Sequence, residues 1–131
     1  MSKKELLHPE WARAANADFA QGVRIGDTIY VSGQVAQDPD GNLVGEGDME
    51  AQARQVFANI EGVLAVAGAG LADVVKITTY VTDMSQYGGY AKVRREVFPG
   101  ADIASATVAS PTLVSPVFLV EIEATAVIGA G

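Results

Sequence analysis

Few side chains in this sequence have the chemistry to catalyse a reaction. The 131 residues include a single histidine, His8, and no cysteine. This composition excludes disulfides, thiolate nucleophiles, and metal sites built from thiolates or several imidazoles. Ser32 has no His or Lys partner in view that could activate it, so a serine nucleophile is not expected. Catalysis or binding must therefore use carboxylates, hydroxyls, amides or backbone groups.

Glu121 is a candidate for chemistry among the carboxylates. A carboxylate that faces a half-enclosed cleft can have a raised pKa, which suits a general base or a group that positions water. The alternative is a salt bridge across the sheet to Lys76 or Arg24. Ser105 and Thr107 could bind a ligand through their hydroxyls. The alternative is that these hydroxyls bond to the backbone or to water.

The strands that must position these groups follow from alternating and β-branched runs. Such runs predict strands at residues 22–27, 28–34, 73–82, 105–110 and 118–128. Residues 1–18 show no sustained period and are expected to form an N-terminal arm. Trp11 and Phe19 either line a cleft beside a neighbouring subunit or hold this arm to its own core.

Two helices are predicted between the strands. An apolar stripe at three-and-four spacing predicts the first from Met49 to Ala67, with Asp48 as its cap and Gly68–Gly70 as its end. A weaker helix is expected from Tyr87 to Phe98, before a Pro-Gly stop.

The order β-β-α-β-α-β-β predicts one α+β domain over residues 1–131, a mixed β-sheet with the two helices packed on one face. The strand period of two assigns these residues to the helix-covered face: Val23, Ile25, Ile29, Val31, Val75, Ile77, Val81, Val120, Ile122 and Ala124. It assigns these to the opposite face: Arg24, Thr28, Tyr30, Ser32, Gln34, Lys76, Thr78, Tyr80, Glu121 and Glu123. The second face is either a solvated surface or a self-complementary interface of a homo-oligomer.

The charge balance argues against nucleic acid as a partner. Lys and Arg number 9 and Asp and Glu number 16, which gives a net charge of −7. No basic stripe is present that could follow a phosphate backbone. No apolar run approaches the roughly 20 residues of a membrane-spanning helix, and the charged start does not lead into the apolar segment of a signal peptide. A cytoplasmic protein without membrane partners is expected.

Several segments match a known family in order and spacing. They are Gln21–Asp27, Tyr30–Gln34, Asp73–Lys76, Val81–Met84 and Leu119–Ala124. Across residues 19–128 the chain resembles the Rid family, also called YjgF/YER057c/UK114 or RidA-like. The resemblance implies a fold of the Bacillus chorismate-mutase type and a homotrimer that binds small molecules in clefts between subunits. It also implies hydrolysis of reactive enamines or imines, such as 2-aminoacrylate, to 2-keto acids and ammonia, without a metal or organic cofactor.

The family's site residues carry over unevenly. Ser32, Gly33 and Gln34 match its pattern, and Glu121 matches the carboxylate that positions water. Phe19 stands where the family has a tyrosine. The family's asparagine in the second helix falls on Ala91 by ungapped counting.

The arginine that holds the substrate carboxylate in the family is replaced by Ser105. A charged hydrogen bond of that kind contributes about 1.5–3 kcal/mol, so an α-imino acid should bind poorly unless the cation is replaced. The candidates for replacement are Arg94, Arg95 and Arg13.

Three functions remain open at this stage. The first is hydrolysis or tautomerisation of an enamine, an imine or a related unsaturated compound other than 2-aminoacrylate. Glu121 would position water, and Gly33, Gln34, Ser105 and Thr107 would shape the cleft. The second is a trimer that binds a small ligand without catalysis. The third is a ribonuclease or translation inhibitor, which the negative charge and the absence of a His or Lys constellation oppose.

Overall fold

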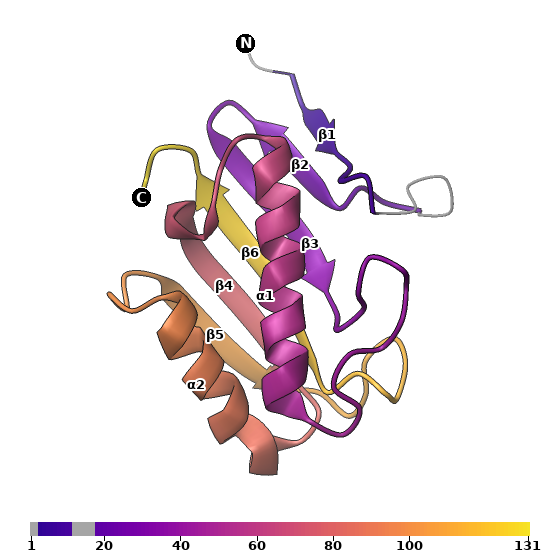
Figure 1. The fold of residues 1–131 in the computed structure, drawn as a ribbon. Coiled ribbons are helices and arrows are strands. Elements are labelled where there is room, and N and C mark those ends of the chain that lie inside the picture. Colours follow the sequence, from indigo (N-terminus) through magenta and orange to yellow (C-terminus); the bar gives the residue numbers. More distant parts are fainter. Residues whose placement is uncertain (1–2, 12–17) are drawn as a thin grey trace.

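Six strands form one mixed sheet, and two α-helices cover one of its faces (Figure 1). The computed structural model describes residues 3–11 and 18–131. The strands are β1 (Glu5–Leu7), β2 (Gly22–Ile25), β3 (Thr28–Gln34), β4 (Val74–Val81), β5 (Ala104–Ala109) and β6 (Val120–Val127). The helices are α1 (Met49–Val66) and α2 (Tyr87–Val97), with short 3₁₀ turns η2 (Leu71–Asp73) and η3 (Met84–Gln86). The predicted α+β class is confirmed.

The sheet has the strand order β1-β2-β3-β6-β4-β5, and only β4 and β5 run parallel. α2 supplies the crossover between these two strands, as a parallel pair requires. The C-terminal strand β6 lies in the middle, between β3 and β4. Glu121 therefore sits on an interior strand, where its pairing with Tyr80 of β4 fixes its position.

One strand was missing from the predicted order. Within the expected arm, Glu5–Leu7 forms β1 and pairs antiparallel with β2. Leu7 is fully buried. Three residues are too few to show a period of two, so the sequence pattern contained no signal for this strand. Residues 12–17 of the arm lie outside the described residues.

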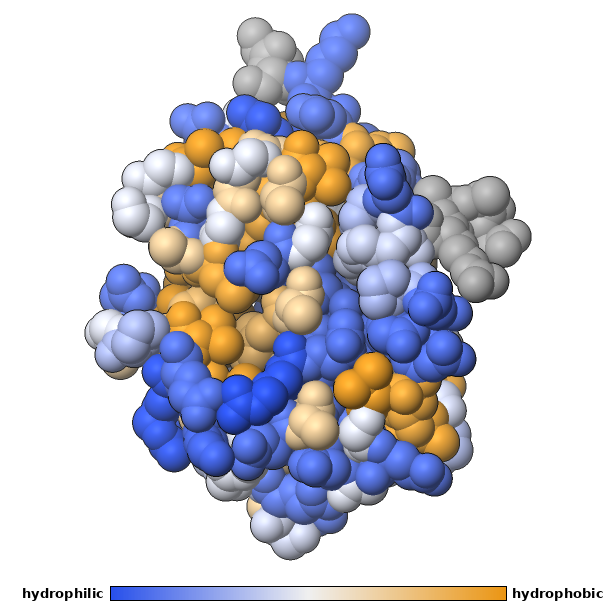
Figure 2. All heavy atoms as spheres, in the orientation of Figure 1, coloured by the Kyte–Doolittle hydropathy of each residue, from blue (hydrophilic) through white to orange (hydrophobic). Residues whose placement is uncertain are grey.

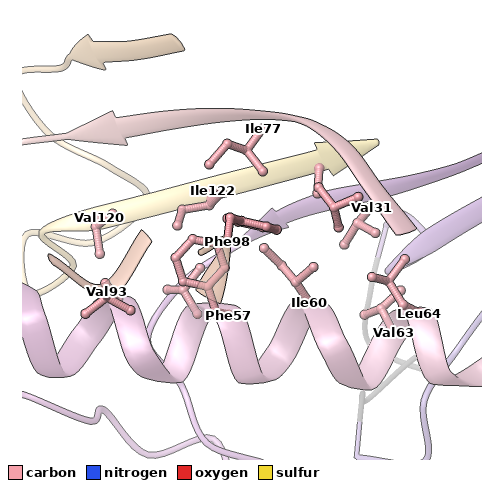
Figure 3. Packing of buried hydrophobic residues seen from close by; sticks show 14 of the residues in the cluster. Val31, Phe57, Ile60, Val63, Leu64, Ile77, Val93, Phe98, Val120 and Ile122 are labelled. Carbon is pink, nitrogen blue, oxygen red and sulfur yellow. The ribbon is translucent and has the colours of Figure 1, made fainter. Parts of the chain in front are cut away.

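α1 begins and ends where its sequence predicts. The Asp48 side chain accepts a hydrogen bond from the backbone N–H of Ala51 at 3.1 Å, and Gly68 takes the left-handed conformation with φ +73°. The side chains of its buried stripe point into the sheet (Figure 3). Phe57 and Phe98 meet edge to face with ring centroids 5.6 Å apart, which joins both helices to one core.

α2 is attached to the sheet by one buried polar contact. The hydroxyls of Tyr90 and Thr79 share a hydrogen bond of 2.6 Å, and both residues are fully buried. An unpaired hydroxyl at this depth would be costly, so each group stabilises the other. The bond holds α2 in place over β4.

The side chains of β2 point to the opposite sides of the sheet from those predicted. Residues directly opposite in an antiparallel pair share a face. Val23 pairs with Tyr30 and Ile25 with Thr28, so both apolar residues of β2 face away from the helices. Arg24 lies on the helix side instead, opposite Ile29.

Two β-bulges, one in β4 and one in β3, make other residues face a different side of the sheet from the one predicted. Between Val74 and Lys76 the register shifts, so Val74 is buried in place of Val75. Between Val31 and Gln34 it shifts again, and Gln34 pairs with Ile122 on the helix side. Gln34 is only 4% exposed rather than part of the outer face. An inserted residue changes the alternation between the residues before it and those after it, which a period of two cannot anticipate.

The face without helices, called the open face below, is partly apolar. Its polar residues include Thr28, Tyr30, Ser32, Lys76, Thr78, Tyr80, Glu121 and Glu123, as predicted. Among its apolar side chains, Leu6 is 53% exposed, Ile25 45% and Val108 44%. Figure 2 views the opposite, helix-bearing side, where apolar areas are interspersed among polar ones. A mixed apolar and polar sheet surface is typical of subunit interfaces.

Gly22 is expected to be intolerant of a side chain. An added Cβ would lie 2.7 Å from Val63 Cγ1 and 3.3 Å from Leu7 Cδ1. Gly22→Ala should lower the free energy of unfolding by about 1–3 kcal/mol through overpacking. Gly88→Ala is the matched control, because a Cβ there meets nothing within 4 Å in α2, and it should raise stability by up to about 1 kcal/mol. Urea unfolding of both variants checks this; equal effects would contradict the packing of β1 onto α1.

Candidate functional site

The bulge in β3 brings a glycine against the predicted catalytic carboxylate. A Cβ on Gly33 would overlap Glu121 Oε2 and would lie 2.9 Å from Glu121 Cδ. Only glycine leaves room for the carboxylate to lie along this backbone. The structure therefore brings together two of the predicted site residues. It also explains why residue 33 is a glycine, because the Glu121 carboxylate lies so close to its backbone.

Gly33 and Glu121 line a cleft of about 570 Å³ at the end of β3, called the bulge cleft below. Its wall also includes Trp11, Phe19, Gln34, Asn59 and Val114. Phe19 is 61% exposed at the rim. Trp11 also packs on α1, since a Cβ on Gly62 would lie 3.0 Å from its Nε1. Trp11 therefore lines the cleft and holds the arm to the core of its own chain.

Ser32 and Gln34 hold the segment that follows Phe19. Ser32 Oγ donates to the carbonyl oxygen of Ala20 at 2.6 Å. Gln34 Nε2 donates to Gln21 Oε1 at 2.9 Å and to the carbonyl oxygen of Ser32 at 3.1 Å. Gln34 lines the bulge cleft, whereas Ser32 lines neither of the two clefts described here. The hydroxyl of Ser32 thus has a backbone partner and a positioning role.

Asn59 on α1 was missed by the sequence analysis. Its Nδ2 donates to the carbonyl oxygens of Val35 and Gln37 at 3.0 and 2.9 Å, and Gln55 Nε2 donates to its Oδ1 at 2.8 Å. It is 5% exposed and fixes the loop that forms one wall of the bulge cleft.

Gln52, seven residues earlier on α1, fixes the segment that leads into β6. It donates to the carbonyl oxygens of Gly45 and Val117 and accepts from the N–H of Leu119 at 2.8 Å. Gln52 and Asn59 both fall within the apolar stripe of α1. A polar residue within an apolar stripe was the signal in the sequence that could have identified Gln52 and Asn59.

The electrostatics of Glu121 suit a proton-transferring group. Burial raises its pKa above the ordinary 4.5, and the charge of Glu123 raises it further. Within residues 3–11 and 18–131 the ion pairs join Arg54 and Lys92 to Glu50 and Glu96, and none involves Glu121. The alternative of a salt bridge to Lys76 or Arg24 is therefore not found there.

Ser105 and Thr107 lie in a second cleft on the other side of the sheet. Ser105 pairs with Ile77 and Thr107 with Thr79, whose side chains face the helices. They line a groove of about 500 Å³ between α2 and β5, called the α2–β5 groove below. Within one chain the predicted site residues are thus divided between two clefts, with Glu121 on the open face of the sheet and Ser105 and Thr107 on the helix side.

Two of the candidate replacement cations line this second groove, namely Arg94 and Arg95. Arg94 Nη1 donates to the hydroxyl of Tyr87 at 3.1 Å. The guanidinium carbon of Arg94 also lies 5.3 Å from the ring centroid of Tyr90, within the range of a cation–π contact. The third candidate, Arg13, lies outside the described residues.

The described part of the chain lacks two further features. No group of three or more His, Asp or Glu side chains there is arranged to hold a metal ion. No helix there has the length and apolar character needed to cross a membrane.

Comparison with known proteins identifies relatives over nearly the whole chain. A family model described as Endoribonuclease L-PSP matches residues 10–128. A RutC family protein of Pyrococcus abyssi is 34% identical over 123 residues, which is 94% of this chain and 96% of that protein. The structure of YyfA, a Rid-family protein of Yersinia pestis, has a TM-score of 0.88 at 33% identity, covering 96% of this chain and 100% of its own. A YjgF/YER057c/UK114 family member from Mycobacterium tuberculosis has a TM-score of 0.82 at 30% identity, with the same coverage.

The raised pKa of Glu121 has a measurable effect on stability. The folded state holds the proton more tightly than the unfolded state, so stability should fall as the pH rises from about 4.5 through the raised pKa. Glu121→Gln cannot ionise. It should therefore be more stable than the wild type at neutral pH, and the difference should disappear at pH values below the ordinary pKa. Urea unfolding against pH checks this.

A matched control uses the neighbouring carboxylate. Glu123→Gln removes the like charge, so the pKa of Glu121, followed by NMR of its carboxyl carbon, should fall toward the ordinary value. A wild-type Glu121 that titrates at or below 4.5 would contradict the environment described for it.

Proposed function

Since this chain belongs to the Endoribonuclease L-PSP family, the group of the RutC, Rid and YjgF/YER057c/UK114 proteins, we propose that it processes a small organic molecule in a cleft between subunits. The reaction we propose is hydrolysis of an enamine or imine, with tautomerisation as its first step. Glu121 is the group that moves the proton, and no metal or organic cofactor takes part.

The chemistry requires one base that can also act as an acid. An enamine takes a proton on carbon and loses one from nitrogen to become the imine. Water then adds to the imine carbon, and the resulting amino alcohol loses ammonia to leave a ketone. A carboxylate with a raised pKa can accept the proton of the attacking water and return it to the departing nitrogen. The observation that carries this proposal is Glu121, half-buried against Gly33, with a raised pKa and no ion-pair partner in the described residues.

The division of the site between two faces supports an oligomer. Glu121 faces the open side of the sheet, whereas Ser105 and Thr107 face the helix side. A small molecule can touch both sets only where the bulge cleft of one copy adjoins the α2–β5 groove of another. The apolar side chains of the open face, among them Ile25 and Val108, offer a surface for such an assembly. We propose the homotrimer that the family resemblance implies.

A binding protein without catalysis is the second candidate. The observation that favours it is how few groups of the bulge cleft are left for chemistry. The Gln34 amide is bonded within the fold, and Asp38 Oδ1 accepts from the backbone N–H groups of Asp40 and Asn42. Glu121 is then the one lining carboxylate without a partner among the described residues.

Ribonuclease activity, which the family model's description names, is not our proposal for this chain. The net charge is −7, and the described lining of the bulge cleft contains no Lys, Arg or His. A phosphodiester substrate would meet repulsion there rather than attraction.

The proposed activity is tested by generating 2-aminocrotonate in situ and following its loss. The wild type should accelerate the loss, and Glu121→Gln should reduce the acceleration by about 10²–10⁴-fold, the usual contribution of a general base. Glu61→Gln is the matched control. It removes the same charge from an exposed position on α1 outside both clefts, and it should keep the activity.

No acceleration by the wild type would overturn the catalytic proposal and leave the binding protein. If Ser105→Arg then accelerated the reaction, the missing family arginine would explain why the wild type is inactive.

The proposed trimer is tested by sedimentation at micromolar concentration. The wild type should sediment at three times the 13.6 kDa of one chain. Tyr30→Glu places a charge on the open face, where Tyr30 is 54% exposed, and should shift the protein toward single chains. Val66→Glu is the control, since Val66 is 46% exposed at the end of α1 and the variant should remain assembled. A 13.6 kDa wild-type species would contradict the assembly.

A further inference from the structure

Most of the surface inside the bulge cleft is apolar. The aromatic and aliphatic side chains that line it are Trp11, Phe19, Val35, Pro39 and Val114. Two of these are well exposed, Phe19 at 61% and Val114 at 83%. Large apolar side chains left in water around a concave site are typical of a site that binds a ligand. The cleft therefore offers an apolar group a surface against which to be buried.

Much of the polar lining of the cleft is already bonded within the fold. The Gln34 amide donates to Gln21 Oε1 at 2.9 Å, and Asn59 Nδ2 donates to two backbone carbonyl oxygens at 3.0 and 2.9 Å. Asp38 Oδ1 accepts from two backbone N–H groups of its own loop. A polar ligand would have to compete with these bonds, whereas an apolar group would not. Recognition along this wall is therefore by shape and apolar contact.

Two aromatic rings stand at the cleft. The family resemblance places a tyrosine at position 19, and Phe19 lacks its hydroxyl, so the rim is less polar than the family pattern. Trp11 is fixed against α1, where a Cβ on Gly62 would lie 3.0 Å from the Trp11 Nε1. Rings make offset-stacked and edge-to-face contacts with other rings, in addition to burying apolar surface. The pair suits an apolar group with flat faces, such as a phenyl ring.

The cleft is also large for the small enamines that the family resemblance implies. Its volume is about 570 Å³, within the range of roughly 300–1,000 Å³ for clefts that enclose drug-sized ligands. The side chain of 2-aminoacrylate is a single methylene group, which would leave most of this volume to water. The described lining contains carboxylates but no Lys, Arg or His, so it offers no partner for a further anionic group. A bulky uncharged substituent fits both the volume and the charge.

We propose that the bulge cleft accepts an apolar substituent of the substrate of about the size of a phenyl ring, with Phe19, Trp11 and Val114 as the residues that determine this specificity. The proposal rests on the proposed function and deepens it, because it names the substrate class as enamines or imines with a bulky apolar side chain. The reacting carbon would lie at Glu121, and the substituent would extend along the cleft. The three apolar residues take no part in proton transfer and act on the affinity for the substrate.

Binding is tested with stable ketones, independently of catalysis. Trp11 is the single tryptophan of the chain and lines the cleft, so its fluorescence reports directly on this site. Titration with 4-phenylbutan-2-one should change the Trp11 emission and reach saturation. Butan-2-one lacks the ring and should bind about 10- to 100-fold more weakly, because it buries less apolar surface. Equal affinity for the two ketones would overturn the proposal, as would an emission that neither ketone changes.

The specificity residues are tested by substitution. Phe19 is largely exposed, so Phe19→Ala should fold, and it should weaken the binding of 4-phenylbutan-2-one about 10-fold by removing one ring from the rim. Val66→Ala is the matched control, because Val66 is an exposed apolar residue of α1 outside the described lining, and it should bind as the wild type does. Circular dichroism verifies that both variants fold. Unchanged affinity in Phe19→Ala would overturn the assignment.

A second variant covers the case in which Phe19→Ala does not fold. Val114 is 83% exposed, so the fold does not depend on its side chain. Val114→Asp places a charge in the lining, which an apolar substituent would have to desolvate, and it should weaken 4-phenylbutan-2-one at least about 5-fold. Retained affinity would overturn the proposal.

The two proposals fail separately. An amino-acid oxidase generates the imines of phenylalanine and alanine in situ, and these differ only in the phenyl group. The wild type should hydrolyse the phenylalanine imine with the lower KM, and Phe19→Ala should raise that KM with little change in kcat. If the wild type hydrolyses both imines with the same KM, the substrate class is wrong and the activity stands. If it binds 4-phenylbutan-2-one as predicted but hydrolyses neither imine, the apolar site stands and the catalytic proposal fails.

Discussion

The extra residue in β3 is the constraint on which the site depends. The bulge between Val31 and Gln34 turns Gln34 into the core and sets Gly33 directly against Glu121. Without it, the strand would keep its alternation, and the end of β3 would present a side chain where the carboxylate now lies. The amide of Gln34 then holds the segment behind Phe19 through Gln21. One local irregularity thus removes the carboxylate from water and builds the wall beside it.

The sheet separates what lies on its two sides, and this divides the candidate chemistry. The carboxylate belongs to the open face and the arginines belong to the helix side, with the sheet between them. Each half is incomplete alone: the bulge cleft has no cation in its described lining, and the groove has no acid in its own. Assembly would join the two complementary halves. Subunit contact would then create the reaction site and confer stability at the same time.

Local signals in the sequence predicted the local structure well. The Asp48 cap, the left-handed Gly68 and the stripe of α1 are set by neighbours a few residues apart, so they can be recognised without knowing the fold. The facing of Val23 and Ile25 could not be predicted in the same way, because it depends on which residues of β3 stand opposite. The bulges and the three-residue β1 exist only through pairing with distant segments. Glu121 was singled out because it matches the family's carboxylate in the final strand, whereas Asn59 was passed over as part of an apolar stripe.

The strand order also bears on how the protein is made. β6 holds the sheet together, with β3 on one side and β4 on the other, yet it is the last of the six strands along the chain. While the chain grows, the β2–β3 hairpin and the pair β4–β5 have no strand to join them. The sheet can close only after β6 has been synthesised. Folding is then dominated by long-range pairing, which is slow, and the unpaired edges of β3 and β4 are exposed until β6 arrives.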